Sequence, residues 1–291
     1  MNKINKVVIP IAGFGSRMFP ATLGVTKAML PLVDRPVIEY LIEECVLADI
    51  NEIIIVMSES QSSVKDYLTL SNKAVLEKFK AKKEVQELEN LLNKVKISFV
   101  VQKEQKGLGH AVYCAKELVG KEDFGVILGD NPVLARGVKH FGIGQLYDEY
   151  KENKGYYIGV KEVNEEDAKK YGMVSSLDTS KESFLLNGMI EKPQGTPPSL
   201  FAALGRYILG YHIFDYLEKT APGAGGEIQV TDAIQTAIQK ETVYGTKLKG
   251  TCHDTGNRLG FVKATIDYSL TRPELKDEVK EYINIDLKEY L

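Results

Sequence analysis

The sequence is poor in the residues that build disulfide frameworks and metal clusters. Its 291 residues include three cysteines and four histidines, and no tryptophan. The cysteines Cys45, Cys114 and Cys252 are scattered along the chain and form no CxxC pair. This pattern fits a reducing compartment better than a disulfide scaffold or a zinc site.

A large excess of one charge and a long apolar run are also missing. Lys and Arg number 37 against 40 Asp and Glu, so the formal net charge is −3 and nothing attracts nucleic acid or an anionic membrane overall. No apolar run approaches the ~18 residues that span a bilayer, and the first residues do not form a signal peptide. We therefore expect a cytoplasmic protein without nucleic-acid or membrane partners, in which a local cation cluster holds any anionic ligand.

The most informative segment present is an apolar run that ends in a glycine-rich turn. Residues 7–11 (VVIPI) lead into residues 12–17 (AGFGSR), and Lys27 follows. Glycine lets backbone N–H groups approach an anion, and Arg17 and Lys27 neutralise its charge. Such a turn can be purely structural, but the two cations at this spacing favour a phosphate-binding site.

Two common phosphate-binding motifs are absent from this turn. A dinucleotide fingerprint requires a third glycine at position 18, where the chain has Met18, and no convincing ribose-binding acid follows the second apolar run, 53–57. The Gly-Lys-Ser/Thr of a P-loop is missing as well. An NAD-dependent oxidoreductase is therefore disfavoured.

Apolar runs that alternate with helical patterns predict an α/β fold with a parallel sheet in the first half. Strands are expected at 7–11, 53–57, 95–101 and 124–128, and helices at 36–48 and 109–119. In the first helix, the side chains that share one apolar face are Ile38, Leu41, Ile42 and Cys45. Ligands of such sheets bind beyond the carboxyl ends of the strands. The segment 72–94 is expected to be a solvated helical insertion, with subunit contacts as the alternative.

The second half is richer in short strands and polar loops. Strands are expected at 156–163, 173–176, 184–190 and 204–209, and helices at 212–219, 227–239 and 273–291. The chain shows no repeat and no clean linker. We therefore expect one domain whose halves share one sheet and one cleft.

Two aspartates are candidate magnesium ligands. Asp130 follows the apolar run 124–128, which delivers its carboxylate to the ligand edge of the sheet, although such a residue is also a common turn or helix cap. Mg²⁺ binds one or two carboxylates together with substrate phosphates, and Asp254 supplies a second carboxylate. The neighbouring Cys252 and His253 lack distant partners for a zinc set, so zinc or thiol chemistry is disfavoured.

Two further segments carry recognition chemistry. Pro193 fixes the end of a strand so that Glu191 and Lys192 project at an edge, where lysine can meet a phosphate and glutamate can accept from sugar hydroxyls. Gln102 offers a donor and an acceptor, the pattern that a pyrimidine edge requires. His110 is interpreted as a helix-start residue, not as a catalytic base.

These segments occur in the order found in one enzyme family. The segments that carry the likeness are residues 9–18, 20–22, 29–34, 107–112, 171–172, 191–193, 205–207, 222–225, 227–229, 231–234 and 253–257. Together they resemble the bacterial UTP–glucose-1-phosphate uridylyltransferases along nearly the whole chain. The Pro-Gly-Ala-Gly and Glu-Ile-Gln blocks, 222–225 and 227–229, separate it from the thymidylyl- and adenylyltransferase relatives.

The resemblance implies a Rossmann-like, mainly parallel sheet flanked by helices, of the nucleotide-diphospho-sugar transferase type. Added strands form the sugar-binding half, and a helix ends the chain. It implies a nucleotide-binding half at 1–135, a sugar-phosphate-binding half at 136–270, and a C-terminal helix at 271–291. It also implies UTP and glucose 1-phosphate as substrates, Mg²⁺ as cofactor, and a homo-oligomer, either dimer or tetramer.

The same resemblance assigns roles to individual residues. The nucleotide would be held by Ala12, Gly13, Gly15, Gln102 and Gly107. Arg17 and Lys27 would hold the triphosphate, and Asp130 and Asp254 would hold Mg²⁺. The glucose ring would lie against Gly172 and Glu191, with its phosphate on Lys192. The catalytic set is therefore Arg17, Lys27, Asp130 and Lys192.

The chain departs from the family pattern at the rim of this site. Ala28 replaces a glutamate, Gly129 replaces a proline, and residues 22–26 differ from the usual run. Two alternatives therefore stay open: a relative that uses dTTP or another sugar 1-phosphate, and a non-catalytic nucleotide-sugar-binding paralogue. Retention of both carboxylates and of Lys27 and Lys192 argues against the paralogue.

Overall fold

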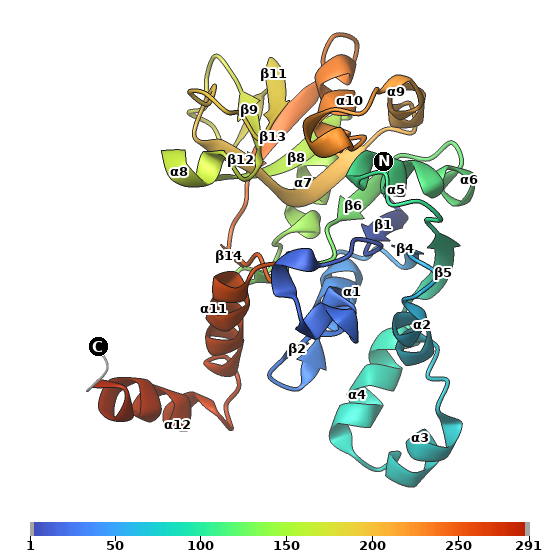
Figure 1. Cartoon of the computed structure of the whole chain (residues 1–291), viewed down its shortest axis with the longest axis vertical. Coiled ribbons are helices and arrows are strands. Elements are labelled where there is room, and N and C mark those ends of the chain that lie inside the picture. Colours follow the sequence, from blue (N-terminus) through green and yellow to red (C-terminus); the bar gives the residue numbers. More distant parts are fainter. Residues whose placement is uncertain (1–2, 289–291) are drawn as a thin grey trace.

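The computed structural model describes residues 3–288 and shows one sheet that runs through the body of the molecule (Figure 1). The first half supplies four parallel strands: β5 (Lys96–Val101), β4 (Glu52–Met57), β1 (Lys6–Pro10) and β6 (Phe124–Ile127). Val7 of β1 pairs with Ile53 of β4 and with Gly125 of β6. The predicted parallel sheet is confirmed.

The second half extends the same sheet with mostly antiparallel strands. Next to β6 lie, in order, β12 (Phe201–Leu209), β8 (Tyr156–Glu162), β13 (Val243–Lys247) and β10 (Ser183–Leu185). A hairpin of β9 (Gly172–Ser175) and β11 (Gly188–Glu191) joins through β12. The halves therefore share one sheet, as predicted, and within the described residues that sheet is mixed.

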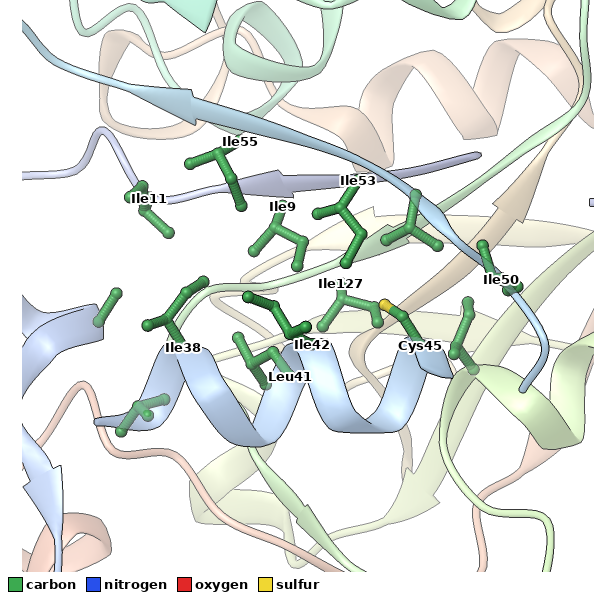
Figure 2. Close-up of a cluster of buried hydrophobic side chains, with 14 of the residues drawn as sticks. Ile9, Ile11, Ile38, Leu41, Ile42, Cys45, Ile50, Ile53, Ile55 and Ile127 are labelled. Carbon is green, nitrogen blue, oxygen red and sulfur yellow. The ribbon is translucent and has the colours of Figure 1, made fainter. Parts of the chain in front are cut away.

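Helices cover both faces of the sheet. Successive residues of a strand point to opposite faces, so a continuous apolar run gives each face apolar side chains that a helix can bury. On one side lie α1 (Val37–Leu47) and α7 (Ile143–Glu152); on the other lie α5 (Leu108–Cys114), α9 (Ile213–Lys219) and α10 (Val230–Ala237). Figure 2 shows the predicted face of α1 packed under the strands, with Ile38, Leu41 and Ile42 facing Ile9 and Ile53. Burial of this apolar surface stabilises the packing of α1 against the sheet.

A buried ion pair joins helix α1 to the second half of the sheet. Nε of Arg206 on β12 donates to Glu44 Oε1 at 2.8 Å, and its Nη2 donates to Oε2 at 2.7 Å. Glu44 Oε1 also accepts from the backbone N–H of Ile143 at 2.7 Å. Because both charges are fully buried and paired, the contact fixes α1, α7 and β12 relative to one another.

Several predicted elements are divided in the structure. The segment 72–94 forms two helices, α3 (Lys73–Phe79) and α4 (Lys83–Leu92), and the helix expected at 109–119 divides into α5 and α6 (Lys116–Val119). The strand expected at 184–190 is wrong: β10 and β11 pair with different strands, and the chain turns between them. Side-chain polarity alone does not show such breaks.

The C-terminal region differs most from the sequence-based expectation. An unpredicted helix, α11 (Arg258–Ser269), precedes α12 (Lys276–Glu281) and a π-helical turn, η5 (Tyr282–Asp286), and α12 projects from the body (Figure 1). The predicted helix 273–291 extends into residues 289–291, which lie outside the described residues. Sequence polarity misses α11 because Leu259, Val262 and Ile266 face outward from it.

The remaining elements are short. They are α2 (Ser62–Leu68), α8 (Glu165–Ala168), β2 (Pro31–Leu32), β3 (Arg35–Pro36), β7 (Val133–Leu134), β14 (Thr251–Cys252) and η4 (Ala224–Gly226). Within residues 3–288, no helix has both the length and the apolar character required of a membrane span.

Candidate active site

A cavity of about 700 Å³ lies where the two halves of the sheet meet. Its walls include every residue to which the sequence analysis assigned a site role. These are Ala12, Gly13, Gly15, Arg17, Lys27, Gln102, Gly107, Asp130, Gly172, Glu191, Lys192 and Asp254. The fold therefore brings the whole predicted set to one place.

The glycine turn is followed by 3₁₀ turns and not by an α-helix. After β1 the chain passes Gly15, whose φ of +66° favours glycine, into η1 (Ser16–Met18), η2 (Ala21–Leu23) and η3 (Lys27–Met29). Thr22 Oγ1 donates to the Gly15 carbonyl at 2.8 Å and holds the turn closed. These turns are too short to act as helix N-termini, so in this segment the positive charge for an anion comes from the Arg17 and Lys27 side chains.

Two cations and two carboxylates form a cluster on one wall of the cavity. Lys27 Nζ donates to Asp130 Oδ2, and Arg17 lies 3.3 Å from Asp254 Oδ2 and 3.8 Å from Asp130 Oδ2. Burial by itself raises the pKa of Asp130, but the Lys27 ammonium and the Arg17 guanidinium outweigh it, and the pKa lies below its ordinary value. Asp130 is therefore an ionised carboxylate in a buried place.

Backbone contacts hold the two acidic loops together. Strands β7 and β14 pair antiparallel just beyond Asp130 and just before Asp254. The backbone N–H and the hydroxyl of Thr255 both donate to the Asp130 carbonyl, at 2.8 and 2.9 Å. A Cβ at Gly256 would collide with Asp130 and Arg17 and would lie 3.0 Å from Asp254 Oδ1, so these three side chains come together against the Gly256 backbone and leave no room for a side chain there.

Gln102 directly follows β5 and is almost fully buried. Its backbone N–H donates to Met57 at 2.8 Å, which continues the β4–β5 pairing. Its amide Nε2 contacts the Gly107 carbonyl at 3.3 Å and His110 Nδ1 at 2.9 Å. The amide nitrogen is thus engaged within the protein, so Gln102 offers the cavity an acceptor and not the expected donor–acceptor pair.

The β9–β11 hairpin builds another wall of the cavity. Gly172 and Glu191 are paired residues across the two strands, so they reach the cavity side by side. Glu191 Oε2 accepts from Thr231 Oγ1 at 2.9 Å, and its Oε1 lies 3.1 Å from Lys192 Nζ. Both carboxylate oxygens are therefore held in place.

Lys192 occupies an uncommon backbone conformation. Its φ is +44°, in the left-handed region that side chains other than glycine, asparagine and aspartate rarely adopt. Its N–H donates to the Tyr171 carbonyl at 3.1 Å, and Pro193 follows directly. Backbone strain of this kind clusters at functional sites, where the surrounding structure enforces it.

The model of the nucleotidyl transferase family matches residues 6–269. The chain belongs to the nucleotidyl transferase family.

Several named relatives align with this nucleotidyl transferase over nearly its full length. UTP–glucose-1-phosphate uridylyltransferase 2 of Staphylococcus saprophyticus is 42% identical over 97% of this chain and 98% of its own length. A UTP-bound UGPase from Acinetobacter baumannii is 35% identical, with a TM-score of 0.87 over 97% of this chain and 99% of its own. UDP-glucose pyrophosphorylase complexed with UDP-glucose is 33% identical, with a TM-score of 0.84 over 93% of this chain and 100% of its own.

Two of the three departures from the usual family pattern, Ala28 and Gly129, lie at or beneath the wall of the cavity and not at its rim as expected. Ala28 is fully buried in the apolar cluster around α1, beside its cavity-lining neighbour Lys27. A Cβ at Gly129 would lie 2.5 Å from Ile11 Cγ2 and 2.9 Å from the Pro10 carbonyl, so this nucleotidyl transferase packs a bare backbone against the end of β1.

Some cavity residues received no role from the sequence. Polar ones among them are Lys169, Lys170, Tyr171, Glu227, Gln229 and Thr231. Three of them lie in the segments 227–229 and 231–234, whose family likeness was the available signal. Their side-chain directions depend on how α10 packs on the β9–β11 hairpin, which the sequence of this nucleotidyl transferase does not show.

Proposed function

We propose that this nucleotidyl transferase is a UTP–glucose-1-phosphate uridylyltransferase, which joins UTP and α-D-glucose 1-phosphate to give UDP-glucose and pyrophosphate. The observation that carries the proposal is a single cavity with two cation groups, Lys27 with Arg17 on one wall and Lys192 on another. Relatives of that name, and structures named for bound UTP and UDP-glucose, support the choice of substrates.

On the nucleotide side we propose that the backbone of the glycine turn holds the nucleotide and that the two nearby cations bind the triphosphate. The proposed nucleotide contacts are Ala12, Gly13, Gly15, Gln102 and Gly107. Gly107 has a φ of +100°, and a Cβ there would lie 2.6 Å from Glu227 Cβ, so only glycine fits between this turn and the segment before α10.

Asp130 and Asp254 fit a hard divalent cation, and we propose that they hold Mg²⁺. The supporting observation is that two carboxylates, which offer only oxygen ligands, lie close together beside the Gly256 backbone. When bound, Mg²⁺ neutralises phosphate charge and polarises the phosphorus under attack. Lys27 and Arg17 balance the two carboxylates in the protein as it stands.

The chemistry requires positioning and charge neutralisation more than a reactive side chain. The phosphate of glucose 1-phosphate is already a nucleophile, so the reaction needs neither a covalent group nor a strong base. Two like charges at ~4 Å repel by about 4 kcal/mol at an effective dielectric constant near 20. Arg17, Lys27 and Lys192 lower this repulsion and keep the two phosphates aligned for in-line attack.

On the sugar side we propose that Glu191 and Gly172 contact the glucose ring and that Lys192 binds its phosphate. Thr231 positions Glu191 through the 2.9 Å hydrogen bond between their side chains. Neither Thr231 nor Glu191 is among the residues that we propose contact the nucleotide. A change at Thr231 is therefore expected to affect one substrate only.

We expect Thr231→Val to raise KM for glucose 1-phosphate about tenfold, because the isosteric change removes one hydrogen bond to the Glu191 side chain. KM for UTP and kcat should stay within about twofold on the same reasoning. Initial rates at varied concentrations of glucose 1-phosphate measure this effect.

Thr231→Ser keeps the hydroxyl and should restore KM. Thr236→Val is the matched control, since that hydroxyl donates to its own helix. Equal rises in both KM values would assign Thr231 a structural role only.

Pyrophosphate release from UTP and glucose 1-phosphate tests the function directly. We expect turnover with Mg²⁺ and none in excess EDTA, and preference for UTP over ATP and GTP by a wide margin and over dTTP by a smaller one. A preference for dTTP would move the chain to the thymidylyltransferases. Nucleotide binding without turnover would support the non-catalytic paralogue.

We also propose the division of labour implied by the family resemblance, with nucleotide binding in residues 1–135 and sugar-phosphate binding in residues 136–270. The segment 271–291 would then act outside the cavity. A cytoplasmic location and a homo-oligomeric state are likewise proposals, which cell fractionation and analytical ultracentrifugation test.

A further inference from the structure

The side-chain amide of Gln102 has a fixed direction in the cavity. Its Nε2 contacts the carbonyl oxygen of Gly107 at 3.3 Å and Nδ1 of His110 at 2.9 Å. Within residues 3–288 no hydrogen bond engages Oε1, and this oxygen is not among the buried unpaired atoms. Since Gln102 lines the cavity, Oε1 is the end of the amide that remains available there.

The partners of the amide determine which end faces them. A carbonyl oxygen only accepts, so the group that faces Gly107 must be the amide NH₂ and not its oxygen. The second hydrogen of that NH₂ then points to His110 Nδ1, which must be an unprotonated acceptor. The imidazole proton therefore sits on Nε2, which lies 3.9 Å from Cys114 Sγ, a weak acceptor.

Rigid backbone surrounds this group of side chains. His110 lies in the first turn of α5, where the Gly109 N–H donates to the Ile228 carbonyl at 2.8 Å. A Cβ at Gly109 would also lie 2.8 Å from that oxygen, so α5 is tightly seated on the segment before α10. The imidazole is therefore attached to a fixed helix, and it can hold the amide in one orientation.

We propose that His110, as the neutral Nε2–H tautomer, is a positioning residue that sets base specificity by turning Gln102 Oε1 toward the cavity. The inference rests on the proposed function, in which residues beside Gln102 hold the base. An acceptor in this position pairs with the imide N–H of uracil. Cytosine presents a ring nitrogen lone pair at the same place, so two acceptors would face each other without a hydrogen.

The size of the effect follows from the hydrogen bond that is lost. Sites built around one donor–acceptor pattern reject an analogue with the wrong pattern far more strongly than they reject a difference of one methyl group. Removing the His110 acceptor leaves only Gly107 to orient the amide. We expect the preference for UTP over CTP to fall about tenfold, the equivalent of one hydrogen bond.

Calorimetric binding of UTP and of CTP to the full-length protein, without sugar phosphate, tests this proposal. His110→Leu removes the acceptor at similar size, whereas His110→Asn keeps a side-chain oxygen close to the position of Nδ1. We expect the wild type and His110→Asn to discriminate strongly and His110→Leu to lose about tenfold of the discrimination. His212→Leu, at an exposed histidine outside the cavity, is the control, and thermal melting reports the fold of each variant.

A wild-type UTP:CTP ratio in His110→Leu overturns the proposal, and so does an equal loss in the leucine and asparagine variants, which would reduce His110 to a packing role. ¹⁵N NMR of the imidazole in the free protein gives an independent readout. The Nε2–H tautomer is expected, and an Nδ1–H tautomer contradicts the assignment. No sugar phosphate enters these measurements, so failure of the proposed turnover would leave them unaffected and is distinguished from failure of this inference.

Discussion

Replacing Asp130 by asparagine is expected to lower kcat by at least about three orders of magnitude, the equivalent of ~4 kcal/mol, while the fold survives. The substitution preserves the shape of the side chain and removes the charge that we propose anchors Mg²⁺. It also leaves Lys27 without its carboxylate partner. An ion pair on an exposed surface contributes only about 0–1 kcal/mol, because water solvates both charges. Asp130 is 7% exposed and lies between two cations, so water cannot compensate for the loss of its charge.

Pyrophosphate release gives kcat, and electron paramagnetic resonance of Mn²⁺ in the presence of UTP gives metal binding apart from turnover. We expect both to fall in Asp130→Asn and circular dichroism to remain unchanged. Asp277→Asn, on the exposed helix α12, is the matched control. Retention of more than about a tenth of kcat, a loss of only ~1.4 kcal/mol, would show that Asp130 is not the central ligand.

Replacing Lys192 by asparagine should raise KM for glucose 1-phosphate about 100-fold, the equivalent of ~2.7 kcal/mol, and KM for UTP less than about twofold. The ammonium faces the cavity beside Glu191, on the wall that we assign to the sugar phosphate. Asparagine tolerates a positive φ better than alanine does, so the variant removes the charge without adding backbone strain at φ +44°.

Lys192→Arg keeps the positive charge and should recover most of the affinity for glucose 1-phosphate. The two KM values, measured with the other substrate saturating, separate the possible roles. Equal increases in both would place Lys192 on the triphosphate or in a structural role. A variant that matches the wild type would return Lys192 to the solvated surface, since its side chain is 45% exposed.

The elements that the sequence predicts well are those in which residue polarity follows the geometry of the backbone. The runs at 7–11, 53–57 and 124–128 are apolar on both faces, as buried parallel strands must be, and each is a strand in the structure. The apolar face of α1 recurs at helical spacing and packs as predicted (Figure 2). Elements without such a pattern, such as α11 with its apolar outer face, were missed.

Short segments of the sequence also pointed to the candidate site, because the glycine turn and Glu191–Lys192 carry their chemistry in consecutive residues. The sequence by itself thus pointed to the residues that we propose bind phosphate, metal and sugar. It did not determine which side chains touch. Arg17 and Asp254 are separated by 237 positions, and their 3.3 Å contact exists only because β7 and β14 pair beside the end of β6.

The tertiary structure also determined which side-chain atoms are already hydrogen-bonded within the protein and which remain available to a ligand. Gln102 shows a donor and an acceptor in the sequence, but the Gly107 carbonyl and His110 engage the amide nitrogen. Thr231 contacts Glu191 because α10 packs against the β9–β11 hairpin. The physical reason is common to both cases: side-chain polarity encodes the local backbone, whereas hydrogen-bond partners depend on the order in which distant strands and helices pack.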